Sequence, residues 1–194
     1  TAMSSNQIAV SVRGIAKSFG STRILHDITV DIETASVHAL VGENGAGKSS
    51  LGKIIGGYYS PDQGQVTVGG ALVTRFSPRD ALRHGVAMIH QELQLVPELT
   101  VAQNVFLGQE SARAGVLVGG DLARFHALET TCDFGLDPMA KVANLRIAER
   151  QKVEIMRAIA RDARVIIMDE PTSSLTEDEA ERLHALIARL KAQG

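Results

Sequence analysis

Residues 42–50 have the types and spacing that could hold a phosphate group. In order they are Gly42, Glu43, Asn44, Gly45, Ala46, Gly47, Lys48, Ser49 and Ser50. Main-chain N–H groups can wrap a triphosphate closely only where residues lack a Cβ atom, which the three glycines provide. Lys48 adds a positive charge that can reach the outer phosphates, and the Ser49 hydroxyl is a suitable Mg²⁺ ligand. We therefore predict a phosphate-binding loop over these residues.

Two flanking segments are expected to position this loop. Residues 37–41 form a short, mostly apolar run that predicts a buried strand, and Leu51, Ile54 and Ile55 recur at helical spacing before Gly56. A strand, a glycine-rich loop and a helix N-terminus, whose dipole favours an anion, are the setting that the motif requires. The alternative is an ordinary strand-to-helix turn that matches the pattern by accident.

A second candidate site is the acidic pair Asp169 and Glu170, which follows the apolar run 165–168. That run is typical of a strand in a central parallel sheet covered on both faces. Ligands of an open α/β sheet lie beyond the carboxyl ends of its strands, so the loop and the acidic pair are expected to open on one crevice. Successive side chains of an extended segment point to opposite sides. We therefore expect Asp169 to approach Mg²⁺, usually through water, and Glu170 to polarise the attacking water.

The amino-terminal half is predicted to be rich in strands. Alternation of apolar and polar residues predicts strands over 8–12 and 28–32, with a loop at 17–20 between them. Later strands are expected through Val66 and Val68 and over 86–89.

The pattern then becomes helical. Ser77 and Pro78 predict the start of a helix that ends by Gly85. Residues 93–146 are interpreted as a helical insert. The helices predicted within and after it cover 101–107 (capped by Thr100), 121–133 and 147–161, a loop covers 115–120, and a last helix carries Leu183, Ile187 and Leu190 on one face.

Composition limits the class of protein. A chain of 194 residues predicts one domain with at most a subdomain. Its net charge of −2 and pI near 6.3 give no electrostatic case for a nucleic-acid partner. The single cysteine, Cys132, cannot form an internal disulfide, which fits a reduced, cytosolic setting, and it is interpreted as a small buried hydrophobe. No apolar run approaches the roughly 20 residues that span a bilayer, and no signal peptide opens the sequence.

The motifs, in their order, resemble those of a known family. The chain looks like the nucleotide-binding domain of an ATP-binding cassette (ABC) transporter, because it contains GENGAGKSS, MIHQEL and VIIMDEPTSSLT in this order. The sequences around the last two motifs are most similar to the ATPase subunits of bacterial ribose- and galactose-type monosaccharide importers. The likeness runs from about Ile8 to the last residue. It implies an α/β P-loop NTPase fold with a parallel-sheet core, an antiparallel β subdomain and a helical insert, without the C-terminal strands.

The resemblance also implies roles that spacing alone does not give. ATP and Mg²⁺ are the implied ligands, with Phe19 stacking on adenine and residues 42–50 binding the phosphates. Ser49, Gln91 and Asp169 are the implied metal contacts, and Lys48, Gln91 and Glu170 the catalytic residues. Residues 173–176 match the segment that contacts a second nucleotide-binding domain. The helical insert, about 93–146, is similar to the subdomain that docks the membrane permease, which places the protein at the cytoplasmic face of the membrane and, indirectly, beside a periplasmic sugar-binding protein.

Two departures from the family pattern stand out. The signature segment falls on residues 145–151, where Arg146 occupies a position that is normally serine. An arginine there could pair with a phosphate, or its bulk could obstruct closure of two domains. The second departure is the switch histidine, because none of the six histidines lies in the right context. We therefore expect residues 7–194 to be a truncated N-terminal cassette, and residues 1–6 an appended remnant.

Three functions remain in view from the sequence. The leading one is an ATPase that drives monosaccharide import through a permease. The second is a nucleotide-binding module that gates a partner without turnover, with Arg146 as its mark. The third is a cassette protein of translation or DNA repair. The acidic pI and the importer-like sequence around Gln91 argue against it.

Overall fold

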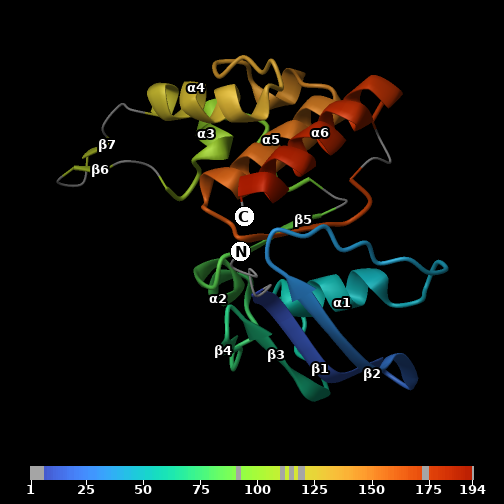
Figure 1. Cartoon of the computed structure of the whole chain (residues 1–194). Coiled ribbons are helices and arrows are strands. Elements are labelled where there is room, and N and C mark those ends of the chain that lie inside the picture. Colours follow the sequence, from blue (N-terminus) through green and yellow to red (C-terminus); the bar gives the residue numbers. More distant parts are fainter. Residues whose placement is uncertain are drawn as a thin grey trace, which may run out of the picture. The chain divides into compact units, whose positions relative to one another are not determined.

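The computed structural model describes residues 7–90, 93–109, 112–113, 116–117, 121–171 and 175–193 (Figure 1). The strands are β1 (Ile8–Phe19), β2 (Thr22–Glu33), β3 (Gln63–Val68), β4 (Ala71–Leu72), β5 (Val86–Ile89), β6 (Ala112–Arg113), β7 (Val116–Leu117) and β8 (Val165–Met168). The helices are α1 (Lys48–Ile55), α2 (Pro78–Arg83), α3 (Val101–Val105), α4 (Asp121–Cys132), the short 3₁₀ helix η1 (Val142–Asn144), α5 (Ile147–Ala160) and α6 (Glu177–Gln193). This mixture of strands and helices confirms the predicted α/β class.

The chain divides into two compact units. The first unit comprises Thr1–Met88, Arg164–Ile167 and Ile187–Gly194, and the second comprises Ile89–Ala163 and Met168–Leu186. The predicted phosphate-binding loop belongs to the first unit, whereas Asp169 and Glu170 belong to the second.

The first unit is built on a four-stranded antiparallel sheet in the order β2-β1-β3-β4. β1 and β2 form a long hairpin, drawn in blue in Figure 1, in which Ile15 pairs with Ile28 and Phe19 with Thr22. The strands predicted over 8–12, over 28–32 and through Val66 and Val68 are therefore confirmed, and the first two are longer than the sequence indicates.

The loop predicted over residues 17–20 is wrong for its first three residues, which belong to β1. Asp62 provides the physical reason, because its carboxylate accepts hydrogen bonds from Lys17 Nζ at 2.9 Å and from the Ser18 N–H at 2.7 Å. Only Gly20, at a φ of 60°, and Ser21 form the turn.

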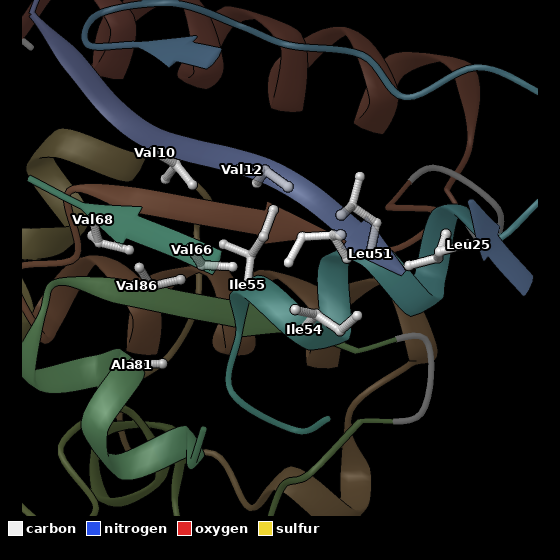
Figure 2. Close-up of a cluster of buried hydrophobic side chains, with 11 residues drawn as sticks. Val10, Val12, Leu25, Leu51, Ile54, Ile55, Val66, Val68, Ala81 and Val86 are labelled. Atoms are coloured by element: carbon white, nitrogen blue, oxygen red, sulfur yellow. The ribbon is translucent and has the colours of Figure 1, made fainter. Parts of the chain in front are cut away.

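Alternate residues of β1 and β3 form the core of the first unit together with α1 (Figure 2). The cluster consists of Val10, Val12, Ile15, Leu25, Leu51, Ile54, Ile55, Val66, Val68, Ala81 and Val86. Burial of each large aliphatic side chain in this way stabilises the folded state by roughly 1.5–3 kcal/mol. The helical spacing of Leu51, Ile54 and Ile55 thus holds α1, and with it the loop that precedes Lys48, against the sheet.

Residues 37–41 do not form the buried strand that the sequence predicts. The segment has no regular secondary structure, and Val37, Leu40 and Val41 are 60%, 42% and 92% exposed. An apolar run becomes a strand only where another strand offers partners for its backbone groups. Residues 37–41 join none of the sheets in the described part of the chain. The predicted phosphate-binding loop is therefore held in place by the packing of α1, the helix that follows it.

β5 and β8 form a parallel pair. Near their starts the N–H groups of Arg164 and Val165 donate to the Gly85 carbonyl at 2.8 and 3.0 Å, and past their ends the Asp169 N–H donates to the Ile89 carbonyl at 3.2 Å. The predicted strands over 86–89 and 165–168 are confirmed, although β8 is half-buried at all four positions rather than fully covered. Because the pair runs parallel, Asp169 and the residue after β5 leave the sheet at the same edge.

The second unit is mainly helical, as the sequence predicts for its insert. Thr100 and Gln103 form a reciprocal capping box at the start of α3. Asn104 is completely buried in α3, and its side chain bonds to both backbone groups of Val96, at 2.8 and 3.0 Å. The predicted helices over 121–133 and 147–161 are confirmed as α4 and α5.

Residues 116–117 correct the loop predicted over 115–120, because they form β7 and pair antiparallel with β6. The other residues of that predicted loop lie outside the described residues. Within the described part of the chain, no helix is both long enough and apolar enough to cross a membrane.

Candidate nucleotide-binding site

The glycine-rich loop turns directly into α1. Gly47 is the N-cap residue of this helix, with a φ of 89°, and Gly45 has a φ of 86°. Both values lie in the left-handed region that favours glycine. A Cβ atom at Gly47 would lie 2.6 Å from Leu25 Cδ2, whereas at Gly45 it would meet no atom within 4 Å. Gly47 is therefore required for packing against β2, and Gly45 leaves open space on the loop that a phosphate group fits.

Lys48 binds the loop that precedes it. Its Nζ donates to the carbonyl oxygens of Gly42 at 2.7 Å and Glu43 at 2.8 Å. The Ala46 N–H also donates to the Glu43 carbonyl, at 3.1 Å. The carbonyls are thus turned toward the lysine, and a positive charge lies within the loop at the N-terminus of α1, where the helix dipole also favours an anion.

The remaining loop residues are accessible. Residues 42–46 and Ser49 are exposed, and Ser50 is half-buried in the first turn of α1. Hydroxyl oxygens and a few waters are the ligands that Mg²⁺ accepts, so Ser49 at this position fits a metal bound beside phosphates. The loop therefore offers backbone N–H donors, a positive charge and a hydroxyl group, which are the groups that a phosphate with a bound Mg²⁺ needs.

Phe19 lies at the end of β1 in the same unit. Its ring is 42% exposed and meets Tyr59 edge-on, at 5.2 Å between centroids. Its partner in the hairpin, Thr22, lies two residues before Ile24, whose side chain would approach a Cβ atom at Gly47 to 3.2 Å. The structure thus brings Phe19 and the glycine loop to one end of the β1–β2 hairpin.

Tyr59 is a neighbour of Phe19 that sequence reasoning missed. Lys17 Nζ lies 5.5 Å from the centre of the Phe19 ring, and Lys53 Nζ lies 5.7 Å from that of Tyr59. The adjacent tyrosines after Gly57 were the available signal, but their side chains cannot be assigned to a site by spacing alone.

Asp169 and Glu170 lie in the second unit, just past the end of β8. Asp169 is half-buried and Glu170 is exposed. Glu170 has a φ of 50°, in the left-handed region, so the segment is not extended and the alternation predicted for the two side chains does not apply. Such a conformation is strained for a non-glycine residue and is frequent at functional sites.

Metal ligation by these residues stays a prediction. In the described residues no group of three or more His, Cys, Asp or Glu side chains is close enough to hold a metal ion.

Three predicted residues lie outside the described residues: Gln91, Ser173 and Ser174. Thr176, at the end of the same predicted segment, is described and caps α6. Its N–H and its hydroxyl both donate to Glu179 Oε2 at 3.1 Å. These bonds, together with Lys152 of α5 at 3.4 Å, hold the pKa of Glu179 below its ordinary value.

Arg146 begins α5 as its N-cap residue. The Arg146 N–H donates to Glu149 Oε2 at 2.8 Å, and its guanidinium lies 3.4 Å from Glu149 Oε1. The backbone bond and then the guanidinium hold the pKa of Glu149 below its ordinary value. The arginine side chain is 79% exposed, so its charge is presented to solvent at a helix start.

The chain matches the family model described as ABC transporter over residues 25–173. This span is more than half of the sequence, and the chain therefore belongs to the ABC transporter family. That membership agrees with the glycine loop, the acidic pair after β8 and the mixed α/β fold.

Named relatives make the likeness more specific. The chain is 50% identical over 183 residues to an arabinose import ATP-binding protein of Ralstonia nicotianae, a match that covers 94% of this chain and 36% of that protein. It is 46% identical over 187 residues to a putative ribose/galactose/methyl galactoside import ATP-binding protein of Rhizobium johnstonii, covering 95% and 36%. It is 43% identical to a ribose import ATP-binding protein of Chromobacterium violaceum, covering 95% and 37%. The chain thus spans little more than a third of the length of these relatives.

Solved structures support the fold. An ATP-binding cassette of an ABC transporter in its ADP conformation superposes with a TM-score of 0.84 at 24% identity, covering 96% of this chain and 78% of that chain. A nucleotide-free cassette gives a TM-score of 0.83 at 23% identity.

Proposed function

We propose that this chain binds and hydrolyses ATP as part of the energising subunit of a bacterial ABC importer for a monosaccharide. The observation that carries the proposal is the glycine loop at the start of α1, in which Gly45 and Gly47 adopt left-handed backbone angles and Lys48 bonds within the loop. The relatives are named import ATP-binding proteins for arabinose, ribose, or ribose, galactose and methyl galactoside, which supports a monosaccharide as the substrate class of the transporter.

Each residue has a defined role in this proposal. The backbone N–H groups of residues 45–49 and Lys48 bind the phosphates, and Phe19 stacks on adenine. Ser49, Asp169 and Gln91 would hold Mg²⁺, which neutralises phosphate charge when bound. Glu170 accepts a hydrogen bond from the attacking water and orients it in line with the outer phosphate.

The proposed partners follow from the resemblance to the ATPase subunits of ABC importers. Residues 93–146 form the helical subdomain that docks a membrane permease, at the cytoplasmic face of the membrane. Residues 173–176 contact a second nucleotide-binding domain, and a periplasmic sugar-binding protein acts indirectly through the permease. In this proposal residues 7–194 are one nucleotide-binding cassette of the transporter. The permease, the second nucleotide-binding domain and the sugar-binding protein are not part of these residues.

A second candidate is a cassette that binds ATP and gates its partner without turnover. Arg146 favours it, because its exposed guanidinium stands at the start of α5 where the family pattern has serine. The deciding experiment is ATPase activity of the full-length protein assembled with its permease. Turnover that rises with transported sugar supports the importer, and ATP binding without turnover supports the gating module.

A further inference from the structure

The segment between α1 and β3 fastens the end of β1. Its last residue, Asp62, donates its N–H to the Ala16 carbonyl at 2.9 Å. One carboxylate oxygen of Asp62 accepts from Lys17 Nζ at 2.9 Å, and the other accepts from the Ser18 N–H at 2.7 Å. Three consecutive residues of β1 are therefore bonded to one residue outside the hairpin. Phe19 comes next in the strand, so its backbone is held as well.

Tyr59 of the same segment contacts the ring of Phe19. The two rings meet edge-on, with their centroids 5.2 Å apart. Tyr59 is half-buried and packs against the hydrophobic core of the first unit. Its N–H and that of Tyr58 donate to the Lys53 carbonyl, at 3.2 and 2.7 Å. The Tyr59 ring is therefore tied to the last turn of α1, the helix that begins at Lys48.

Burial does not explain why the Phe19 ring is held. The ring remains 42% exposed despite its contacts, and an exposed apolar side chain that served no purpose would not need to be fixed. An aromatic ring that is both fixed and accessible is a surface on which a nucleobase can stack. Lys17 Nζ, 5.5 Å from the centre of the ring, adds a positive charge beside this surface.

α1 connects the aromatic pair to the glycine loop. At its start, a Cβ atom on Gly47 would lie 2.6 Å from Leu25 Cδ2 of β2, so this end of the helix contacts the hairpin near its turn. After its end, Tyr59 contacts Phe19, which pairs with Thr22 at the same turn. The helix has eight residues and therefore rises only about 12 Å. The loop and the Phe19 ring are thus fixed to the same short helix within the first unit.

We propose that Tyr59 and Asp62 are positioning residues that hold the Phe19 ring in place relative to the glycine loop. One nucleotide can then stack its base on Phe19 while its phosphates bind beside Lys48, an inference that rests on the proposed function. Tyr59 acts through the ring of Phe19 and Asp62 acts through the backbone of β1, so neither has to touch the nucleotide. The ligand class that follows is a triphosphate with an aromatic base rather than a bare polyphosphate.

The first test compares the binding of ATP with that of inorganic tripolyphosphate, which lacks a base. Calorimetric titration of the full-length protein gives both affinities. Tyr59→Leu should weaken ATP binding by about 2- to 12-fold, the factor that an aromatic pair contributes. The affinity for tripolyphosphate should stay within about twofold of the wild-type value. Tyr59→Phe keeps the ring and should bind ATP normally, as should the control Tyr58→Leu, which removes the adjacent tyrosine.

The second test asks whether both residues act through Phe19. Phe19→Leu should weaken ATP binding by about 5- to 150-fold, the range for a base stacked on an aromatic ring. Phe19→Leu/Tyr59→Leu should bind ATP no more weakly than Phe19→Leu, because a positioning residue has no effect once its ring is gone. Asp62→Ala changes an exposed side chain and should lose affinity for ATP alone, by a factor similar to that of Tyr59→Leu. Thermal unfolding reports the folding of each variant, and Asp62→Ala decides the matter if Tyr59→Leu does not fold.

The two hypotheses fail differently. If the wild-type protein does not bind ATP, the proposed function is wrong. If it binds ATP and a folded Tyr59→Leu or Asp62→Ala variant matches it, only the positioning role is wrong. Equal losses of affinity for ATP and tripolyphosphate would also overturn that role, and so would a double variant whose loss is the product of the two single losses.

Discussion

Lys48 Nζ lies 2.7 Å from the carbonyl oxygen of Gly42, so the lysine of the loop is bonded to the glycine that opens it. The neighbouring carbonyl, of Glu43, accepts a second bond at 2.8 Å. With these two carbonyls turned toward the lysine, the loop acquires a fixed curvature. A charge held inside a curved, glycine-rich loop at a helix N-terminus supports the proposal that this loop binds a phosphate group.

Replacing Lys48 by alanine tests the loop assignment. Lys48→Ala should weaken ATP binding by about 10- to 150-fold, since a hydrogen bond to a charged group is worth about 1.5–3 kcal/mol. Titration of ATP by calorimetry measures this directly. Lys53→Ala, which removes the same charge from the same helix, is the control and should bind as the wild type does. Unaltered affinity in Lys48→Ala would refute the assignment.

The two left-handed glycines should differ in what they tolerate. Gly45→Ala costs only the left-handed backbone, roughly 1–2 kcal/mol. Gly47→Ala bears a similar cost and also drives a Cβ atom to 2.6 Å from Leu25, and overpacking typically adds about 1–3 kcal/mol. Urea unfolding without nucleotide should therefore show the larger loss for Gly47→Ala. Equal losses would mean that the loop does not pack against β2 as described.

The sequence predicts the helices, strands and caps that are determined by residues close together in the chain. The capping residues Ser77 and Thr100, the helical spacing on α1 and the alternation in β1 and β3 all act within a few residues. Each of them is found where the pattern indicates. The same holds for the glycine loop, because backbone angles near Gly45 and Gly47 are set by residue type.

The features that the sequence did not predict depend on interactions with residues distant in the chain. The run 37–41 has the composition of a strand but joins no sheet of the described residues, and no local pattern reports that. β1 continues through Lys17 because Asp62 holds it. The left-handed backbone angle of Glu170 likewise comes from the assembled fold, so spacing could not predict it.

Glu170→Gln separates binding from chemistry. Glutamine keeps the size of the side chain and the backbone conformation but cannot take a proton from water. We expect ATP affinity close to wild type and turnover reduced by about 10²- to 10⁴-fold, the range of general-base catalysis. Phosphate release by the assembled full-length protein is the measurement. Normal hydrolysis would show that another residue orients the water.

The stability of α6 should depend on pH through Glu179. The Thr176 N–H is the main cause that holds the pKa of this carboxyl below its ordinary value. A lowered pKa in the folded state means that the stabilisation is complete above the unfolded value, about 4.3, and is lost as the pH falls through the folded value. Thermal unfolding of wild type and Glu179→Gln should therefore differ most near neutral pH, and the difference should shrink as the pH falls below the unfolded value of about 4.3. A difference that stays constant down to pH 3 would contradict this.

The dependence of ATP affinity on Mg²⁺ tests most directly the proposal that Ser49 and Asp169 bind the magnesium ion of Mg-ATP. Calorimetric titration with a non-hydrolysable ATP analogue, in Mg²⁺ and in EDTA, gives the gain in affinity due to the metal. We predict that Asp169→Asn reduces this gain by about 10- to 100-fold, as loss of a group that orients a metal does, and that Ser49→Ala reduces it too. The control is Asp162→Asn, which removes an exposed carboxylate from the turn after α5 and should leave the gain unchanged. A full Mg²⁺ gain in Asp169→Asn would contradict the assignment of Asp169 to the magnesium ion.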